Sequence, residues 1–157
     1  MPIHLSIPGR GESVWRYLVL DLNGTLSADG IVIPGVAERI QALGNTLEIR
    51  LLTADTRGTA QEIAHQLAIR CHRIGRHEQS AQKARFISSL GAESVVAIGN
   101  GANDSEMLAL ADLGIAVLGP EGTAVSALLR ADIVVPDICT ALDLLLNPQR
   151  VVATLRV

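Results

Sequence analysis

Short apolar runs alternate with amphipathic segments along most of this 157-residue chain. The runs are typical of strands in a parallel sheet, and they predict strands at residues 17–20, 47–53, 71–75, 94–99, 114–119 and 132–136. The segments between them have apolar residues at helical spacing, and they predict helices at residues 35–43, 56–69, 80–91, 103–114, 123–131 and 139–146. The repetition predicts an α/β fold: a three-layer, Rossmann-like parallel sheet with helices on both faces.

The start of the chain departs from this alternation. Residues 1–16 hold two β-like runs around the turn sequence Pro8-Gly9-Arg10-Gly11, which predicts an N-terminal β-hairpin. We see no linker, repeat or low-complexity tract, so we expect one domain over residues 1–157. The stretches of sequence between Asp21, Thr53 and Lys83 are taken up by predicted core strands and helices, so they leave no room for a cap domain. Residues Ser27 to Pro34 would form at most a flap.

Composition narrows the class of protein. Hydrophobic residues make up 48% of the chain, aromatic residues 2%, and the net charge is −3. Few aromatic side chains and no basic excess argue against nucleic-acid binding. Cys71 and Cys139 fit no metal or redox spacing. The first twenty residues show no signal-peptide pattern and the apolar runs are too short to span a membrane, so we expect a soluble cytoplasmic protein.

Polar side chains follow the predicted strands. Asp21, Asn23 and Thr25 follow the first, Thr53 and Asp55 end another, and Asn100, Asn103 and Asp104 follow a third. Ligands of parallel α/β sheets bind at the carboxyl ends of the strands. We therefore expect these side chains to gather at one edge, joined by Lys83 from a helix.

Such a set suits phosphoryl transfer. A strand-end carboxylate can attack phosphorus while backbone N–H groups of the following turn hold the phosphoryl oxygens. A lysine offsets the developing charge, and carboxylate or amide oxygens are ligands that Mg²⁺ prefers. Positioning and charge neutralisation supply most of the catalysis of this reaction.

The same residues resemble the four motifs of the haloacid dehalogenase superfamily. The segment from Asp21 to Leu26 is similar to the first motif, Thr53 to the second, Lys83 to the third, and Gly99-Asn-Gly-Ala-Asn-Asp104 to the fourth. The region after residue 80 is similar to the phosphorylation domain of P-type cation-transporting ATPases, and the chain most resembles small, capless, soluble P-type-ATPase-like hydrolases.

The resemblance implies a role for each matching residue. Asp21 would be the nucleophile that becomes an aspartyl phosphate, and Thr53 and Lys83 would bind the phosphoryl group. The implied phosphate-binding residues are Asp21, Leu22, Asn23, Thr53, Ala54 and Lys83. The implied Mg²⁺ ligands are Asp21, Asn23, Asn100 and Asp104. Thr25 and Asn103 would support the site. The implied substrate is a small phosphorylated molecule.

Two residues depart from the family pattern. Phosphatases of the superfamily have an acid where this chain has Asn23, and an amide cannot protonate a leaving group or activate water. We therefore expect slow hydrolysis, since general acid–base catalysis contributes about 10²–10⁴-fold. Asn100 stands where the fourth motif usually has Asp, which would weaken Mg²⁺ binding. The alternative hypothesis is a degenerate phosphate- or metal-binding module without significant turnover.

Other features admit plainer interpretations. Asp55 is expected to be a turn or cap residue, although a role in the site stays open. The basic cluster around His72 and His77 is expected to be a solvated edge. An uncapped site would be open to water or covered by a neighbouring subunit, so a homo-oligomer is an open alternative to a monomer.

Overall fold

A six-stranded parallel sheet forms the centre of the protein in the computed structural model, which describes residues 1–55 and 58–157. The strand order is β10-β9-β8-β3-β6-β7. The strands are β3 (Tyr17–Leu20), β6 (Glu48–Thr53), β7 (Arg70–Arg73), β8 (Val95–Gly99), β9 (Leu113–Val117) and β10 (Ile133–Val135). Every neighbouring pair is parallel. The predicted fold class is confirmed.

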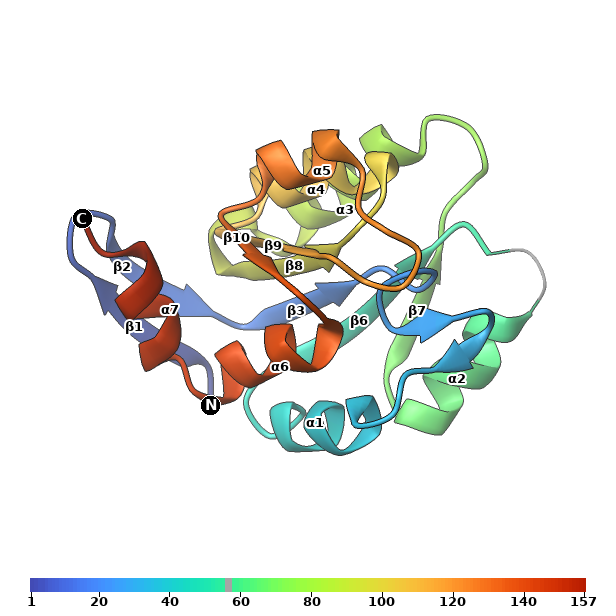
Figure 1. The fold of residues 1–157 in the computed structure, drawn as a ribbon, viewed down its shortest axis with the longest axis horizontal. Coiled ribbons are helices and arrows are strands. Elements are labelled where there is room, and N and C mark those ends of the chain that lie inside the picture. The colour runs from blue at the N-terminus through green and yellow to red at the C-terminus, as the bar shows by residue number, and fades with distance from the viewer. Residues whose placement is uncertain (56–57) are drawn as a thin grey trace.

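Helices cover both faces of this sheet (Figure 1). One face carries α1 (Val36–Leu43), α2 (Thr59–Leu67) and α6 (Ile138–Leu146), and the other carries α3 (Gln79–Leu90), α4 (Ser105–Leu110) and α5 (Val125–Arg130). Successive strand residues point to opposite faces, so Leu18 and Leu20 join one hydrophobic cluster and Val19 joins the other. Burial on both faces explains why the central strands are uniformly apolar.

The N-terminal hairpin is present and packs with the end of the chain. β1 (Ile3–Ile7) and β2 (Gly11–Trp15) pair antiparallel, and Trp15 Nε1 donates a 2.6 Å hydrogen bond to Asp112 Oδ2. A helix absent from the sequence prediction, α7 (Gln149–Leu155), lies against β1. Both chain ends lie at this end of the molecule (Figure 1).

The region expected to form a flap holds a small antiparallel pair, β4 (Ser27–Ala28) and β5 (Ile31–Val32). Within the two described ranges, no separate cap domain interrupts the alternation of strands and helices. Within the same ranges, no helix has the length and apolar character needed to cross a membrane.

One predicted boundary was wrong by more than two residues, the end of the fourth helix. The helix expected over residues 103–114 is a 3-10 turn, η2 (Ala102–Asp104), followed by α4, which ends at Leu110. Ala111 is extended, and the chain enters β9 at Leu113 and leaves it at Val117, before the predicted end at residue 119. The start predicted for the second helix, at residues 56 and 57, lies outside the described residues. The other boundaries agree within two residues, the usual uncertainty of such assignments.

Candidate active site

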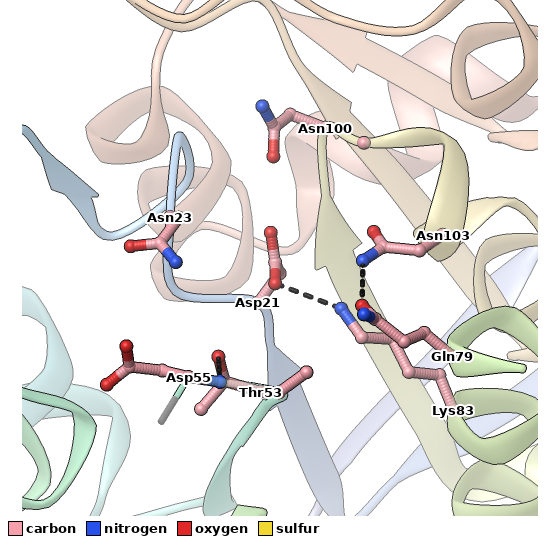
Figure 2. A pocket seen from close by; sticks show the side chains of 10 residues that line it. Asp21, Asn23, Thr53, Asp55, Gln79, Lys83, Asn100 and Asn103 are labelled. Carbon is pink, nitrogen blue, oxygen red and sulfur yellow. Dashed lines mark hydrogen bonds and ion pairs between the residues drawn. The ribbon is translucent and has the colours of Figure 1, made fainter. Parts of the chain in front are cut away.

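The predicted polar residues meet at the carboxyl ends of β3, β6 and β8. Asp21 follows β3, Thr53 ends β6, Asn100 follows β8, and Lys83 comes from the second turn of α3. Together they surround a cavity of about 340 Å³ (Figure 2). Its lining comprises Asp21, Asn23, Thr53, Ala54, Asp55, Gln79, Lys83, Asn100, Gly101 and Asn103.

The turn after β3 is anchored by its own backbone. The Leu22 carbonyl accepts hydrogen bonds from the N–H groups of Thr25 and Leu26 at 3.2 and 3.0 Å, and the Leu22 side chain is buried in the core. Gly24 has φ of +77°, and a Cβ added there would lie 2.4 Å from Asn100 Nδ2. Glycine is therefore required both by the backbone conformation and by the close approach of Asn100.

Lys83 is the single lysine of the chain and is 1% exposed. Its Nζ lies 3.0 Å from Asp21 Oδ1 and 2.7 Å from Asp104 Oδ1. Burial alone would lower the pKa of Lys83, but the two carboxylates outweigh it and raise the pKa above its ordinary value. Because a buried ion needs paired charge, Lys83 is held as an ammonium ion at the cavity wall.

The surroundings of Asp21 disfavour its charged form. Burial, followed by repulsion from Asp104, raises the pKa of Asp21 to about 7, and the opposing effect of Lys83 does not cancel the rise. One ammonium group is shared by two carboxylates, so the cluster carries excess negative charge. A cation in the cavity would relieve it.

Asp104 lies beneath the cavity lining and is 0% exposed. Its Oδ2 accepts hydrogen bonds from the backbone N–H groups of Asn100 and Gly101 at 3.0 and 2.9 Å, and its Oδ1 faces Lys83. Both oxygens are thus used to hold the loop after β8 and to orient Lys83. Any direct bond from Asp104 to a metal ion would compete with these contacts.

Thr53 presents its hydroxyl to the cavity. The N–H of Asp55 donates to Thr53 Oγ1 at 3.1 Å, so the hydroxyl acts as an acceptor toward the backbone. Its own proton remains available for an acceptor in the cavity. This is the arrangement required for donation to a phosphoryl oxygen.

Asn100 connects three segments of the site. Its Oδ1 accepts from Thr25 Oγ1 at 3.2 Å, and its Nδ2 donates to the Gly122 carbonyl at 3.1 Å. Its own carbonyl accepts from Ala124 N–H at 2.8 Å. An aspartate would lack the donor to Gly122, so the amide has a structural reason.

Asn23 is exposed and lies on the side of the cavity opposite Lys83 (Figure 2). Near Lys83, Asn103 Nδ2 donates to Gln79 Oε1 at 2.7 Å. Sequence reasoning missed Gln79. The available signal was its position four residues before Lys83, on the same helical face.

Most predicted site residues therefore line one cavity, and three lie behind it. Leu22, Thr25 and Asp104 are fully buried supports and are not part of the lining. The lining adds Asp55, Gln79 and Gly101 to the predicted set. His72 and His77 are absent from the described lining. His72 instead contacts Arg50 Nη1 through Nε2 at 2.8 Å.

The donor set fits a hard divalent cation. The cavity offers carboxylate and amide oxygens from Asp21 and Asn100 beside a cluster with excess negative charge. In the described parts of the chain, no group of three or more His, Cys, Asp or Glu side chains forms a metal cage. This suits Mg²⁺, which keeps several waters and is usually bound by one or two carboxylates together with substrate phosphate.

Comparisons with known proteins place these residues in a family context. The profile of the haloacid dehalogenase-like hydrolases matches residues 79–127, a range that contains Lys83 and Asp104. An uncharacterised protein of Methanocaldococcus jannaschii is 55% identical over 78 residues, covering 47% of this chain and 84% of that protein. A copper-transporting ATPase, HMA5 of Oryza sativa subsp. japonica, is 33% identical over 128 residues, covering 77% of this chain and 12% of the ATPase.

Solved structures share the fold. The 3-deoxy-D-manno-octulosonate 8-phosphate phosphatase of Moraxella catarrhalis, in complex with magnesium, phosphate and KDO, has a TM-score of 0.68 at 18% identity, covering 90% of this chain and 94% of that chain. The cobalt-bound phosphatase of Haemophilus influenzae has a TM-score of 0.71 at 15% identity, covering 87% and 90%. The catalytic domain of the CPx-ATPase CopB-B has a TM-score of 0.61 at 29% identity, covering 73% of this chain and 45% of that chain.

Proposed function

From its similarity to the haloacid dehalogenase-like hydrolases, we propose that this chain is a Mg²⁺-dependent phosphohydrolase that forms an aspartyl phosphate on Asp21. One observation carries the proposal. Lys83, buried at the cavity wall, contacts Asp21 at 3.0 Å and Asp104 at 2.7 Å. An ammonium group fixed beside a cavity-lining carboxylate is suited to hold a transferring phosphoryl group next to its nucleophile.

In the first step, an oxygen of the Asp21 carboxylate attacks phosphorus and the bond from phosphorus to the leaving oxygen breaks. Lys83 and the Thr53 hydroxyl stabilise the charge on the phosphoryl oxygens, and backbone N–H groups of the turn at Leu22 and Asn23 and of Ala54 contribute further donors. Water then attacks phosphorus, the bond to Asp21 breaks, and the carboxylate is restored.

We assign the Mg²⁺ ligands to the Asp21 carboxylate, the Asn23 main-chain carbonyl and the Asn100 side-chain oxygen. When bound, Mg²⁺ supplies charge neutralisation and alignment of the phosphoryl oxygens. Asp104 orients Lys83 and the Asn100–Gly101 backbone, and joins the metal site at most through a water molecule. Thr25 and Asn103 support the site through Asn100 and Gln79.

Turnover would be slow if proton transfer depended on Asn23 alone, because a side-chain amide has no titratable proton near neutral pH. The substrate class is a small phosphomonoester. The solved sugar-acid phosphatases support that class through their shared fold, without identifying the particular molecule.

The test is a screen of small phosphomonoesters, acetyl phosphate and ATP with Mg²⁺, with phosphate release as the readout. We expect slow release that Asp21→Asn abolishes. Glu106→Gln removes an exposed carboxylate from α4 and serves as the matched control with unchanged rate. Equal activity in Asp21→Asn would exclude Asp21 as the nucleophile.

A second candidate function is binding of phosphate or metal without turnover. It is favoured by the two amides, Asn23 and Asn100, because the second already has hydrogen-bond partners at both side-chain atoms. Beryllofluoride with Mg²⁺ separates the two functions. A stable complex that depends on Asp21 supports a competent phosphoryl site, and its absence favours the binding module.

A further inference from the structure

The proposed hydrolysis lacks an assigned proton carrier. A leaving oxygen must gain a proton, and the attacking water must lose one, and positioned side chains usually perform both transfers. Asn23 lines the cavity at the side opposite Lys83, but its amide cannot act as a general acid or base near neutral pH (Figure 2). Another titratable group at this side of the cavity would fill the missing role.

Asp55 is such a group. Among the described lining residues, two are carboxylates, Asp21 and Asp55, and Asp21 is the proposed nucleophile. Asp55 and Asn23 also line an adjoining cavity of about 550 Å³. Figure 2 shows Asp55 on the same side of the site as Asn23, away from Lys83. The carboxyl group thus lies where the two cavities meet, at the approach of a leaving group or of water.

The chain holds Asp55 in a defined place. Its N–H donates to the hydroxyl of Thr53 at 3.1 Å, which ties it to a proposed phosphate ligand. Its Oδ2 accepts from the N–H of Ala60, in the first turn of α2, at 3.1 Å. The backbone of Asp55 is therefore held by the strand end that presents Thr53, and its carboxyl group is oriented by the first turn of α2.

Charged and titratable groups surround Asp55 on several sides. Asp29 and Glu121 line the adjoining cavity with it, and Asp21 and Lys83 line the first cavity. On β7, Cys71 is close enough for Asp55 to add to the rise in the pKa of its thiol, a rise mainly due to burial and opposed by Arg73.

We propose that Asp55 is the general acid–base residue of this site, in place of Asn23; the inference rests on the proposed phosphohydrolase function. In the first step, the carboxylic acid of Asp55 gives its proton to the leaving oxygen as the bond from that oxygen to phosphorus breaks. In the second step, the carboxylate takes a proton from the water that attacks phosphorus. Phosphate leaves, the Asp21 carboxylate is restored, and Asp55 regains its proton.

A plainer role for Asp55 is to cap α2 through Ala60. Asp55→Asn separates the two roles, because asparagine keeps a side-chain oxygen for the Ala60 N–H and caps helices about as well as aspartate. Asp55→Ser is a second variant able to cap. Both variants lose the carboxyl group that would carry the proton. A purely structural role therefore predicts no change in rate when the cap is kept.

The experiment labels the protein with radioactive acetyl phosphate and Mg²⁺, removes the reagent, and follows the loss of label. We expect Asp55→Asn to slow the loss at least about 10-fold with an unchanged unfolding midpoint. Adding Asn23→Asp to the same chain should restore fast loss, because the new carboxyl group supplies the proton transfer. Glu121→Gln, which removes an acid from the adjoining cavity only, should decay like the natural protein.

The possible outcomes distinguish the role of Asp55 from the proposed phosphohydrolase function. Label that depends on Asp21 but decays at the natural rate in Asp55→Asn overturns the role of Asp55 and leaves the phosphohydrolase standing. Failure of both Asp55→Asn and Asp55→Ser to fold would show a structural role and overturn it as well. Absence of any Asp21-dependent label overturns both proposals.

Discussion

Lys83 and Asp21 form a buried ion pair, with Lys83 Nζ 3.0 Å from Asp21 Oδ1. Of the 13 lysine and arginine residues in the chain, Lys83 is the single lysine. It lies where a compact ammonium ion contacts two carboxylates. The pair links the first strand of the sheet to α3 across 62 residues of sequence.

Replacing this lysine should destabilise the fold as well as the site. Lys83→Met leaves Asp21 and Asp104 without their common cation, and removal of one partner from a buried ion pair typically costs about 3–5 kcal/mol. Urea unfolding at pH 8 measures the loss. Arg85→Met, on the exposed face of the same helix, is the matched control and should cost far less. Equal losses in the two variants would mean that the buried pair contributes no special stability.

Asp21 should make the stability of the metal-free protein depend on pH. Its pKa is about 7 in the folded protein and 3.8 as the ordinary value, so the folded state binds the additional proton between these values. The stabilisation from protonated Asp21 is complete below pH 3.8 and is lost as the pH rises through 7. Asp21→Asn does not titrate, so it should gain stability relative to the natural protein as the pH rises.

The expected gain between pH 5 and pH 8 is roughly 1–3 kcal/mol, since one pKa unit corresponds to about 1.4 kcal/mol. Unfolding in EDTA at pH 5 and pH 8 measures it. A difference between the two proteins that is constant with pH would contradict the raised pKa.

Asn23→Asp should accelerate hydrolysis. The new carboxyl group would stand at the cavity rim, where Asn23 now lies exposed, and would add to the acid–base catalysis by Asp55, with a gain smaller than the roughly 10²–10⁴-fold that such catalysis supplies alone. Phosphate release under saturating Mg²⁺ measures the gain. An unchanged rate would place the limiting step in metal binding or substrate capture.

Asn100→Asp should destabilise the metal-free protein despite restoring an acid at this position. The substitution removes the donor to the Gly122 carbonyl and places a carboxylate oxygen against it. Loss of a buried hydrogen-bond partner costs about 1–3 kcal/mol. Asn45→Asp is a matched control, because Asn45 Nδ2 also donates to a backbone carbonyl, that of Ala42, but in solvent. Thermal unfolding in EDTA should show a much larger loss for Asn100→Asp.

The sequence was most informative where one physical cause dominated. The buried strand at Leu18 to Leu20 is apolar because both its faces are covered, and the polar residue after it had to lie at the ligand edge. The order of strands and helices and the gathering of Asp21, Thr53 and Asn100 followed from these two facts. Lys83 lies in a helix, and its role in the site was expected from the likeness to the third family motif.

The features that the sequence did not predict depend on contacts between residues far apart in the chain. Whether Leu113 continues a helix or begins a strand depends on pairing with Val96, far away in sequence. The helix at Val151 is stabilised by contact with β1 at the opposite end of the chain. Asp55 was expected to be a turn or cap residue and Gln79 was missed, and only the folded chain shows that both line the cavity.

The central claim is that Asp21 accepts a phosphoryl group. The direct measurement is trapping of the phosphorylated protein with radioactive acetyl phosphate and Mg²⁺, followed by acid quenching and peptide mapping. The account predicts a label on the peptide containing Asp21 that is absent in Asp21→Asn and present in Glu106→Gln. Equal labelling of Asp21→Asn, or a label on another residue, would contradict it.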